Sequence, residues 1–151
     1  MRALLDTSVL IGDTAPEGIE AAVSVASIAE LHFGVLVASD DDERALRTQR
    51  LGAIESAVDP LPITVEIARE WGRLAAAVRT RGGQPRKRTM DLAIAATANV
   101  HRVPLLTENL ADFQTISDLV DARSPSHARS KRADPRPFGE LTGVDVADEN
   151  S

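Results

Sequence analysis

The chain has 151 residues, of which 43% are hydrophobic, so its length and composition predict one domain with a packed core rather than global disorder. It contains no cysteine, which excludes disulfides, zinc–thiolate sites and thiol nucleophiles. Its formal net charge of −6 argues against nucleic-acid binding through the whole surface.

Short strands and helices are expected to alternate along the first half of the chain. A buried strand over residues 2–5 ends at Asp6, and a turn into a short helix follows it. We predict a second strand over residues 21–26. Apolar residues at helical spacing then predict helices over residues 27–38 and 42–57.

The second half continues this alternation. Residues 65–81 carry the most regular amphipathic pattern, and residues 89–100 form a helix that is apolar on nearly every side and is therefore expected to be central. Extended segments are predicted over residues 61–64 and 103–106, and a short helix over residues 110–119. Alternating strands and helices are typical of an α/β fold whose parallel sheet is covered on both faces.

The last thirty residues have a different composition. We assign residues 1–122 to the folded domain and residues 123–140, which are rich in proline and arginine, to a flexible insertion. Residues 141–146 are predicted to return as a final edge strand, and residues 147–151 to form a loose tail. With no signal peptide and no apolar run of roughly 20 residues, we expect a cytoplasmic protein without membrane contact.

Four acidic residues follow or interrupt apolar segments that should be buried. They are Asp6, Glu30, Asp91 and Asp112. Burying several carboxylates together is costly unless a cation compensates. Ligands bind beyond the carboxyl ends of strands in such sheets, which is where Asp6 and the loop before Asp112 are expected. Oxygen ligands favour Mg²⁺ or Mn²⁺, so these acids predict a metal site.

Each acid also has a structural interpretation. Asp6 could cap the helix that follows it, and Asp91 lies in a first helical turn, where acids suit the helix dipole. Glu30 comes three residues after Ser27, which fits a capping box. Asp112 has the least support, because aspartates are ordinary in loops. What favours a functional site is the common position of the four acids at one edge of the sheet.

A basic cluster immediately precedes Asp91. Five positive charges fall within ten residues, at Arg79, Arg81, Arg86, Lys87 and Arg88. Such a cluster is usually a solvated surface, and it could instead hold a phosphate backbone. The sequence supports these two interpretations about equally.

The four acids also lie within motifs that resemble a known family. Residues 4–11 (LLDTSVLI), 27–35 (SIAELHFGV), 91–98 (DLAIAATA) and 105–113 (LLTENLADF) are similar, in order, to the four acidic motifs of PIN-domain ribonucleases. The similarity is greatest to VapC-type toxins of bacterial toxin–antitoxin systems. It implies a three-layer α/β/α PIN fold with a mainly parallel central sheet, Mg²⁺- or Mn²⁺-dependent endoribonuclease activity, a VapB-type antitoxin and a homodimer.

The resemblance also implies roles for individual residues. Asp6 and Asp91 would be the principal metal ligands, Glu30 would complete the metal site, and Asp112 would add a further catalytic carboxylate. Supporting positions would be Thr7, Ser8, Thr107 and Asn109. The chain departs from the family because residues 123–138 separate the last predicted strand from the helix before it.

These observations leave two main hypotheses. The first is a metal-dependent endoribonuclease toxin that cleaves cellular RNA and inhibits growth until its antitoxin binds. The second is a PIN-like module that binds RNA or protein without cutting. A phosphoacceptor domain using Asp6 is disfavoured, because phosphatases of that type need a second aspartate where this chain has Ser8.

Overall fold

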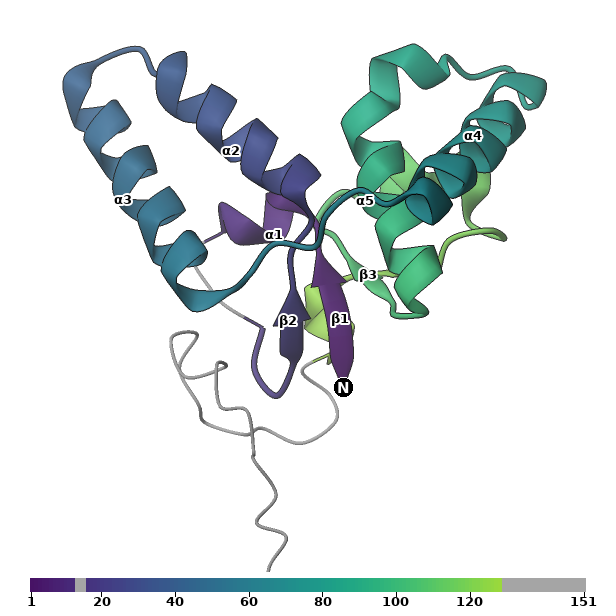
Figure 1. Ribbon diagram of the computed structural model, residues 1–151, viewed down its shortest axis with the longest axis horizontal. Helices are drawn as coiled ribbons and strands as arrows, with labels where there is room; N and C mark the ends of the chain where they lie inside the picture. The colour runs from purple at the N-terminus through teal and green to yellow at the C-terminus, as the bar shows by residue number, and fades with distance from the viewer. Residues whose placement is uncertain (13–15, 129–151) are drawn as a thin grey trace, which may run out of the picture.

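The fold is built on a four-stranded sheet in which every pairing is parallel, as expected from the sequence. The computed structural model describes residues 1–12 and 16–128 (Figure 1). Strand order in the sheet is β2-β1-β3-β4. The strands are β1 (Arg2–Leu5), β2 (Glu20–Ala22), β3 (Leu105–Leu106) and β4 (Ala122–Arg123).

Helices cover both faces of this sheet and complete the expected three-layer α/β/α architecture. The α-helices are α1 (Thr7–Leu10), α2 (Val25–Leu36), α3 (Asp41–Ala57), α4 (Val65–Thr80), α5 (Thr89–His101) and α6 (Pro125–Ala128). Two 3₁₀ segments are η1 (Pro85–Arg88) and η2 (Leu110–Ile116). Figure 1 shows α2 and α3 on one side of the strands and α4 and α5 on the other. In the described residues, no helix is long and apolar enough to cross a membrane.

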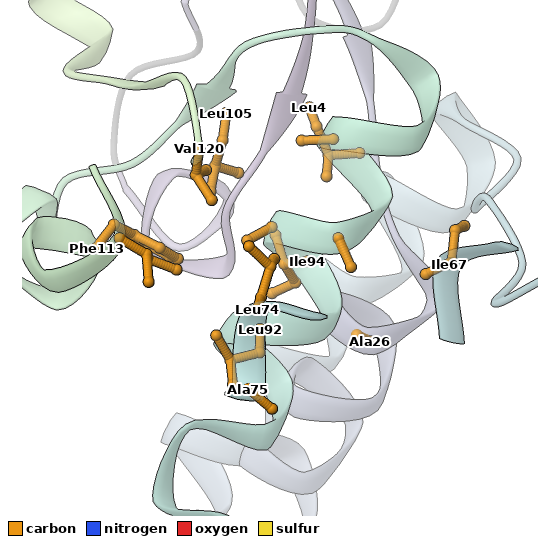
Figure 2. Close-up of a cluster of buried hydrophobic side chains, with 14 of the residues drawn as sticks. Leu4, Ala26, Ile67, Leu74, Ala75, Leu92, Ile94, Leu105, Phe113 and Val120 are labelled. Carbon is orange, nitrogen blue, oxygen red and sulfur yellow. The ribbon is translucent and has the colours of Figure 1, made fainter. Parts of the chain in front are cut away.

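Alternation along the strands divides the core into two parts. Leu4 and Leu105 point into a cluster with α4, α5 and η2, whereas Leu5 and Leu106 point into a second cluster with α1, α2 and α3. Successive side chains of a strand face opposite sides of a sheet, so two adjacent leucines in each central strand serve both layers. Figure 2 shows the first cluster, with Leu4 of β1 near the helical side chains.

The second strand and the helix after it begin earlier than the sequence predicted. β2 ends at Ala22, and Ser24 caps α2, its hydroxyl oxygen accepting a hydrogen bond of 3.0 Å from the Ala26 N–H. The expected strand over residues 21–26 is therefore too long. Ser27 is inside α2 rather than before it, so the capping box with Glu30 is wrong. Glu30 therefore does not cap α2.

The C-terminal boundary also needs correction. Residues 122 and 123 form β4, which pairs with β3 directly after η2, so a strand does follow closely on the acidic helix. The flexible segment expected over residues 123–140 therefore begins with the end of β4 and the single turn of α6. The rest of that segment, the edge strand predicted over residues 141–146 and the tail over 147–151 lie outside the described residues.

Candidate functional site

Asp6 lies at the carboxyl end of the central strand β1 and is 5% exposed. It is the N-cap of α1, with one carboxylate oxygen accepting a hydrogen bond of 2.9 Å from the Thr7 N–H. The other oxygen accepts from the hydroxyls of Ser8 and Thr107, at 2.8 and 2.7 Å. The capping interpretation of Asp6 is thus correct, but it accounts for only one of three hydrogen bonds.

Register between β1 and β3 brings Thr107 to Asp6. Leu5 pairs with Leu106, so the residues that follow each strand are neighbours across the sheet. The loop after β3 then orients both hydroxyls. The Glu108 N–H donates to Ser8 Oγ at 3.1 Å, and the Asn109 N–H donates to Thr107 Oγ1 at 3.0 Å. Because each hydroxyl accepts from a backbone N–H, its own proton is available to Asp6.

Glu30 approaches from α2 and is partly buried. Its carboxylate accepts a hydrogen bond of 2.7 Å from the hydroxyl of Thr7, which also lies 3.1 Å from the Ser27 hydroxyl. Thr7 donates its single proton to Glu30, and the Ser27 proton is then free to bridge the second contact. Thr7 therefore links the two acids, since its backbone binds Asp6 and its side chain binds Glu30.

Asp91 lies in the first turn of α5, as expected, and is partly buried. Burial, followed by the negative charges of Asp6, Asp112 and Glu30, raises its pKa to about 6, and the positive charge of Arg88 opposes this rise. All four predicted acids therefore share one electrostatic environment. Such a shift is frequent at functional sites.

Asp112 and Arg88 face a small cavity of about 60 Å³ beside Asp91. Arg88 donates a hydrogen bond to the main-chain carbonyl of Asp112, which ties the start of α5 to η2. Apolar side chains of α4, α5 and η2 complete the cavity wall: Val78, Leu92, Phe113 and Ile116. Asp112 is partly buried, so its predicted place near the other acids agrees with the structure.

The five residues of the basic cluster are separated by the fold. Arg88 is directed toward the acids, whereas Arg81 pairs with Asp118 at 2.7 Å and donates to the Thr115 carbonyl. The remaining three, Arg79, Arg86 and Lys87, are exposed. The fold therefore places one arginine near the acids, ties another to Asp118 and leaves three basic side chains on the surface.

The acids approach one another, but they do not form a closed ligand cage. Among residues 1–12 and 16–128, no three His, Asp or Glu side chains lie close enough to hold one metal ion. The donor chemistry does fit a divalent cation, because the four carboxylates form a hard oxygen set, and burial together with their mutual repulsion raises the Asp91 pKa. Coordination of one ion by three of them would require a change of side-chain torsions.

Sequence reasoning missed two contributors to this network. Ser27 was interpreted as a helix cap, although its hydroxyl contacts Thr7. The Glu108 N–H was overlooked because a backbone donor leaves no trace in residue type. Asn109 contributes through its own N–H rather than through its side chain. The only sequence signal was the position of Ser27 one turn before Glu30, and no residue type indicated the role of the Glu108 N–H.

A parallel sheet between two helical layers, with carboxylates beyond the carboxyl ends of its strands, places this protein in the class of three-layer α/β/α domains with an acidic site. The chain belongs to the PIN domain family, whose sequence profile matches residues 3–119. The resemblance predicted from the four acidic motifs is thereby confirmed.

Within that family, the chain is similar to VapC proteins. Ribonuclease VapC5 of Mycobacterium tuberculosis is 36% identical over 115 residues, which cover 70% of this chain and 82% of VapC5. Ribonuclease VapC4 of the same organism is 34% identical over 125 residues, covering 78% of this chain and 93% of VapC4. The crystal structure of VapBC-5, a member of the VapBC family of toxin–antitoxin systems from Mycobacterium tuberculosis, superposes with a TM-score of 0.68 at 30% identity. That match covers 82% of this chain and 96% of the other.

The raised pKa of Asp91 predicts a pH-dependent stability. Below about pH 4 the carboxyl is protonated in both the folded and unfolded states, and between about pH 4 and 6 the unfolded state ionises first, so stability falls as pH rises. In metal-free buffer at pH 7, Asp91→Asn should raise the free energy of unfolding by about 1–2 kcal/mol after allowance for solvent screening. Denaturant unfolding at pH 4 and pH 7 measures this.

A matched control is Asp59→Asn, which makes the same change at an exposed position between α3 and α4. It should leave stability nearly unchanged at both pH values. An Asp91→Asn gain of equal size at pH 4 and pH 7 would contradict the electrostatic origin of the effect.

Proposed function

We propose that this protein is a metal-dependent endoribonuclease and the toxin of a toxin–antitoxin system, which cleaves cellular RNA until its antitoxin binds. The observation that carries the proposal is the electrostatic coupling of Asp91 to Asp6, Glu30 and Asp112 at the carboxyl edge of the sheet. Similarity to proteins named ribonucleases VapC5 and VapC4 supports the reaction class.

We assign the cofactor to Mg²⁺, with Mn²⁺ as an alternative. Asp6, Asp91 and Glu30 would hold the ion, and Asp112 would act beside it as a further catalytic carboxylate. A bound divalent ion would screen the repulsion between a water nucleophile and the phosphodiester, and it would stabilise charge on the leaving oxygen. Catalysis by hard ions of this kind suits a set of oxygen ligands.

The surrounding residues prepare the acids for this role. Three hydrogen bonds fix the Asp6 carboxylate, so it does not have to be ordered when a ligand binds. Thr7 sets the position of Glu30 relative to Asp6. Asp91 needs to be ionised to bind a cation, and a pKa of about 6 makes that the major form at pH 7. Protons should therefore compete with the cation for Asp91 as pH falls toward 6.

The partner is proposed from the structural neighbours. VapBC-5 is described as a toxin–antitoxin system, which supports a VapB-type antitoxin for this chain as well. We further propose that the toxin acts as a homodimer in the cytoplasm, where RNA and antitoxin are both available. Mapping cleavage sites in cellular RNA after brief expression would identify the substrate as transfer, ribosomal or messenger RNA.

Replacing the central acid is the direct test. Asp6→Asn retains the shape of the side chain but loses the charge that a metal requires, so RNA cleavage in Mg²⁺ should fall by more than about 100-fold. Asp59→Asn, the exposed control, should cleave at the wild-type rate. Melting curves of both variants establish that the fold is intact, and wild-type activity in Asp6→Asn would exclude the proposed site.

The non-catalytic alternative predicts a different result with metal. Calorimetric titration of Mn²⁺ into the nuclease should show binding that weakens in Asp6→Asn and in Asp91→Asn, because each variant removes a proposed ligand. A module that binds RNA or protein without cutting needs no such ion. Absence of Mn²⁺ binding at millimolar concentration, together with absence of RNA cleavage, would favour the module.

We assign Arg88, among the five basic residues, to the scissile phosphate. Within residues 1–12 and 16–128, no carboxylate lies at ion-pair distance from its guanidinium, which is bound to a carbonyl instead. Its remaining N–H groups are thus available for an anion near the acids. Arg81, Arg79, Arg86 and Lys87 are left with structural or weak electrostatic roles.

Substitution of Arg88 tests this assignment. Arg88→Met should lower kcat by about 10- to 1000-fold, because a charge-stabilising donor is lost, and Arg88→Lys should recover part of the rate. Arg86→Met, which removes an exposed arginine two residues earlier on η1, is the control and should change kcat little. Equal melting temperatures of the Lys and Met variants would separate the catalytic effect from the contact with η2, whereas an unchanged kcat in Arg88→Met would exclude the role.

A further inference from the structure

A second cavity in the described residues lies beside the amino-terminal end of β3, whereas the acids lie beyond the carboxyl ends of the strands. It has a volume of about 510 Å³ and is formed where α4, the end of α5, the residues just before β3 and the residues around β4 meet. Its polar lining contains three arginines and two acids, which are Arg73, Arg102, Arg123, Glu70 and Asp121. None of these residues belongs to the site described above.

Arg102 has the most unusual backbone of this group. It is the C-cap of α5 with φ 56° and ψ 43°, and it is the only non-glycine residue with positive φ in the described part of the chain. Glycine or asparagine adopts this left-handed conformation at lower cost. Its side chain is exposed, and no carboxylate of the described residues is at ion-pair distance. A strained position thus holds an uncompensated guanidinium at a cavity.

The other two arginines are fixed by acids on their own segments. Arg73 binds Glu70 through Nε at 2.7 Å, one turn away on α4. Arg123 binds Asp121 through two N–H groups, at 2.9 and 2.8 Å. These pairs hold both guanidiniums in place while leaving some of their donors free. The dipole of α5 favours a cation at Arg102, but it does not explain why arginines of α4 and β4 line the same cavity.

Arginines also lie between the two sites, along the seam where α4 contacts residues 115–121. Arg88 is at the acids, and Arg81 joins α4 to the segment after η2 through Asp118. The same seam, between α4 and residues 115–121, continues to the cavity wall at Leu119 and Asp121. From Asp91 to Arg102, α5 rises by about 16 Å, at 1.5 Å per residue. That span corresponds to about five nucleotides of a stacked strand.

We propose that this cavity is a second phosphate-binding site, which holds the backbone of an RNA strand several nucleotides from the bond cut at the acids. The proposal rests on the proposed ribonuclease function. Forked guanidinium groups suit phosphate oxygens, and three of them outweigh the two acids at the cavity. The contact would be independent of base identity, because phosphates carry no sequence information.

Arg102→Gly tests the site without weakening the fold, because glycine accepts the left-handed conformation and the melting temperature should equal or exceed that of the wild type. Binding is measured in the Asp6→Asn background, so that RNA is not cut, by fluorescence anisotropy at several salt concentrations. One labelled RNA spans the acids alone, and a second extends at both ends by more than about five nucleotides. Arg50→Gln, at a partly buried arginine of α3 in the other helical layer, is the control.

Arg102→Gly should bind the longer RNA about tenfold more weakly and reduce its salt slope by about one, while affinity for the short RNA stays unchanged. Arg102→Asn should behave in the same way, and Arg102→Lys should recover part of the affinity. Equal affinities of Arg102→Gly and Arg50→Gln for the longer RNA would overturn the proposal.

Two further measurements distinguish free phosphate from RNA as the ligand of the cavity, and a failure of the ribonuclease function from a failure of the second site. Inorganic phosphate is titrated into the wild type and Arg102→Gly while the melting temperature is followed. Saturation only in the wild type, with no change in RNA affinity, would assign the cavity to free phosphate and overturn its role with RNA. If the wild type cuts no RNA but Arg102→Gly still loses affinity for the longer RNA, the ribonuclease function fails and the second site stands as an RNA-binding site.

Discussion

Repulsion between carboxylates at one edge of the sheet is the constraint on which the structure depends. This repulsion acts on Asp91, where burial first, and then the charges of three neighbouring acids, raise the pKa to about 6. Hydrogen bonds to Asp6 and Glu30 offset part of this cost, and their donors come from α1 and from the residues after β3. The bonds that stabilise the negative charge are therefore also bonds that hold separate segments together.

Topology explains why these residues meet. β1 is central, and β3 is parallel to it, so the residues that follow both strands emerge at the same edge. Leucine pairs within the strands fill the two halves of the core and fix the register, and the register places Thr107 next to Asp6. The hydrogen bond between Thr107 and Asp6 therefore depends on apolar packing by residues outside the acidic cluster.

Residues with a local pattern could be predicted from the sequence, and those defined by tertiary contacts could not. The strand before Asp6 and the helix carrying Asp91 have clear apolar patterns, and both were predicted correctly. Ser24 and Ser27 are equally good caps by residue type, and only the full structure shows that Ser24 is used. β4 has two residues, too few for any periodicity, and pairing with β3 alone defines it. The contact of Arg88 with a carbonyl of η2 has no sequence signal either.

A site that binds both a cation and a phosphate also requires that its arginine and its carboxylates stay unpaired. If Arg88 paired directly with Asp91, it would neutralise the negative potential that attracts a divalent cation and would lose the donors that a phosphate needs. Its bond to the Asp112 carbonyl avoids both losses, because a carbonyl fixes the guanidinium without cancelling its charge. The raised pKa of Asp91 is the cost of this arrangement. Positive and negative groups kept close but unpaired can receive a cation and a phosphate together, which neither a neutralised ion pair nor an isolated acid cluster could do.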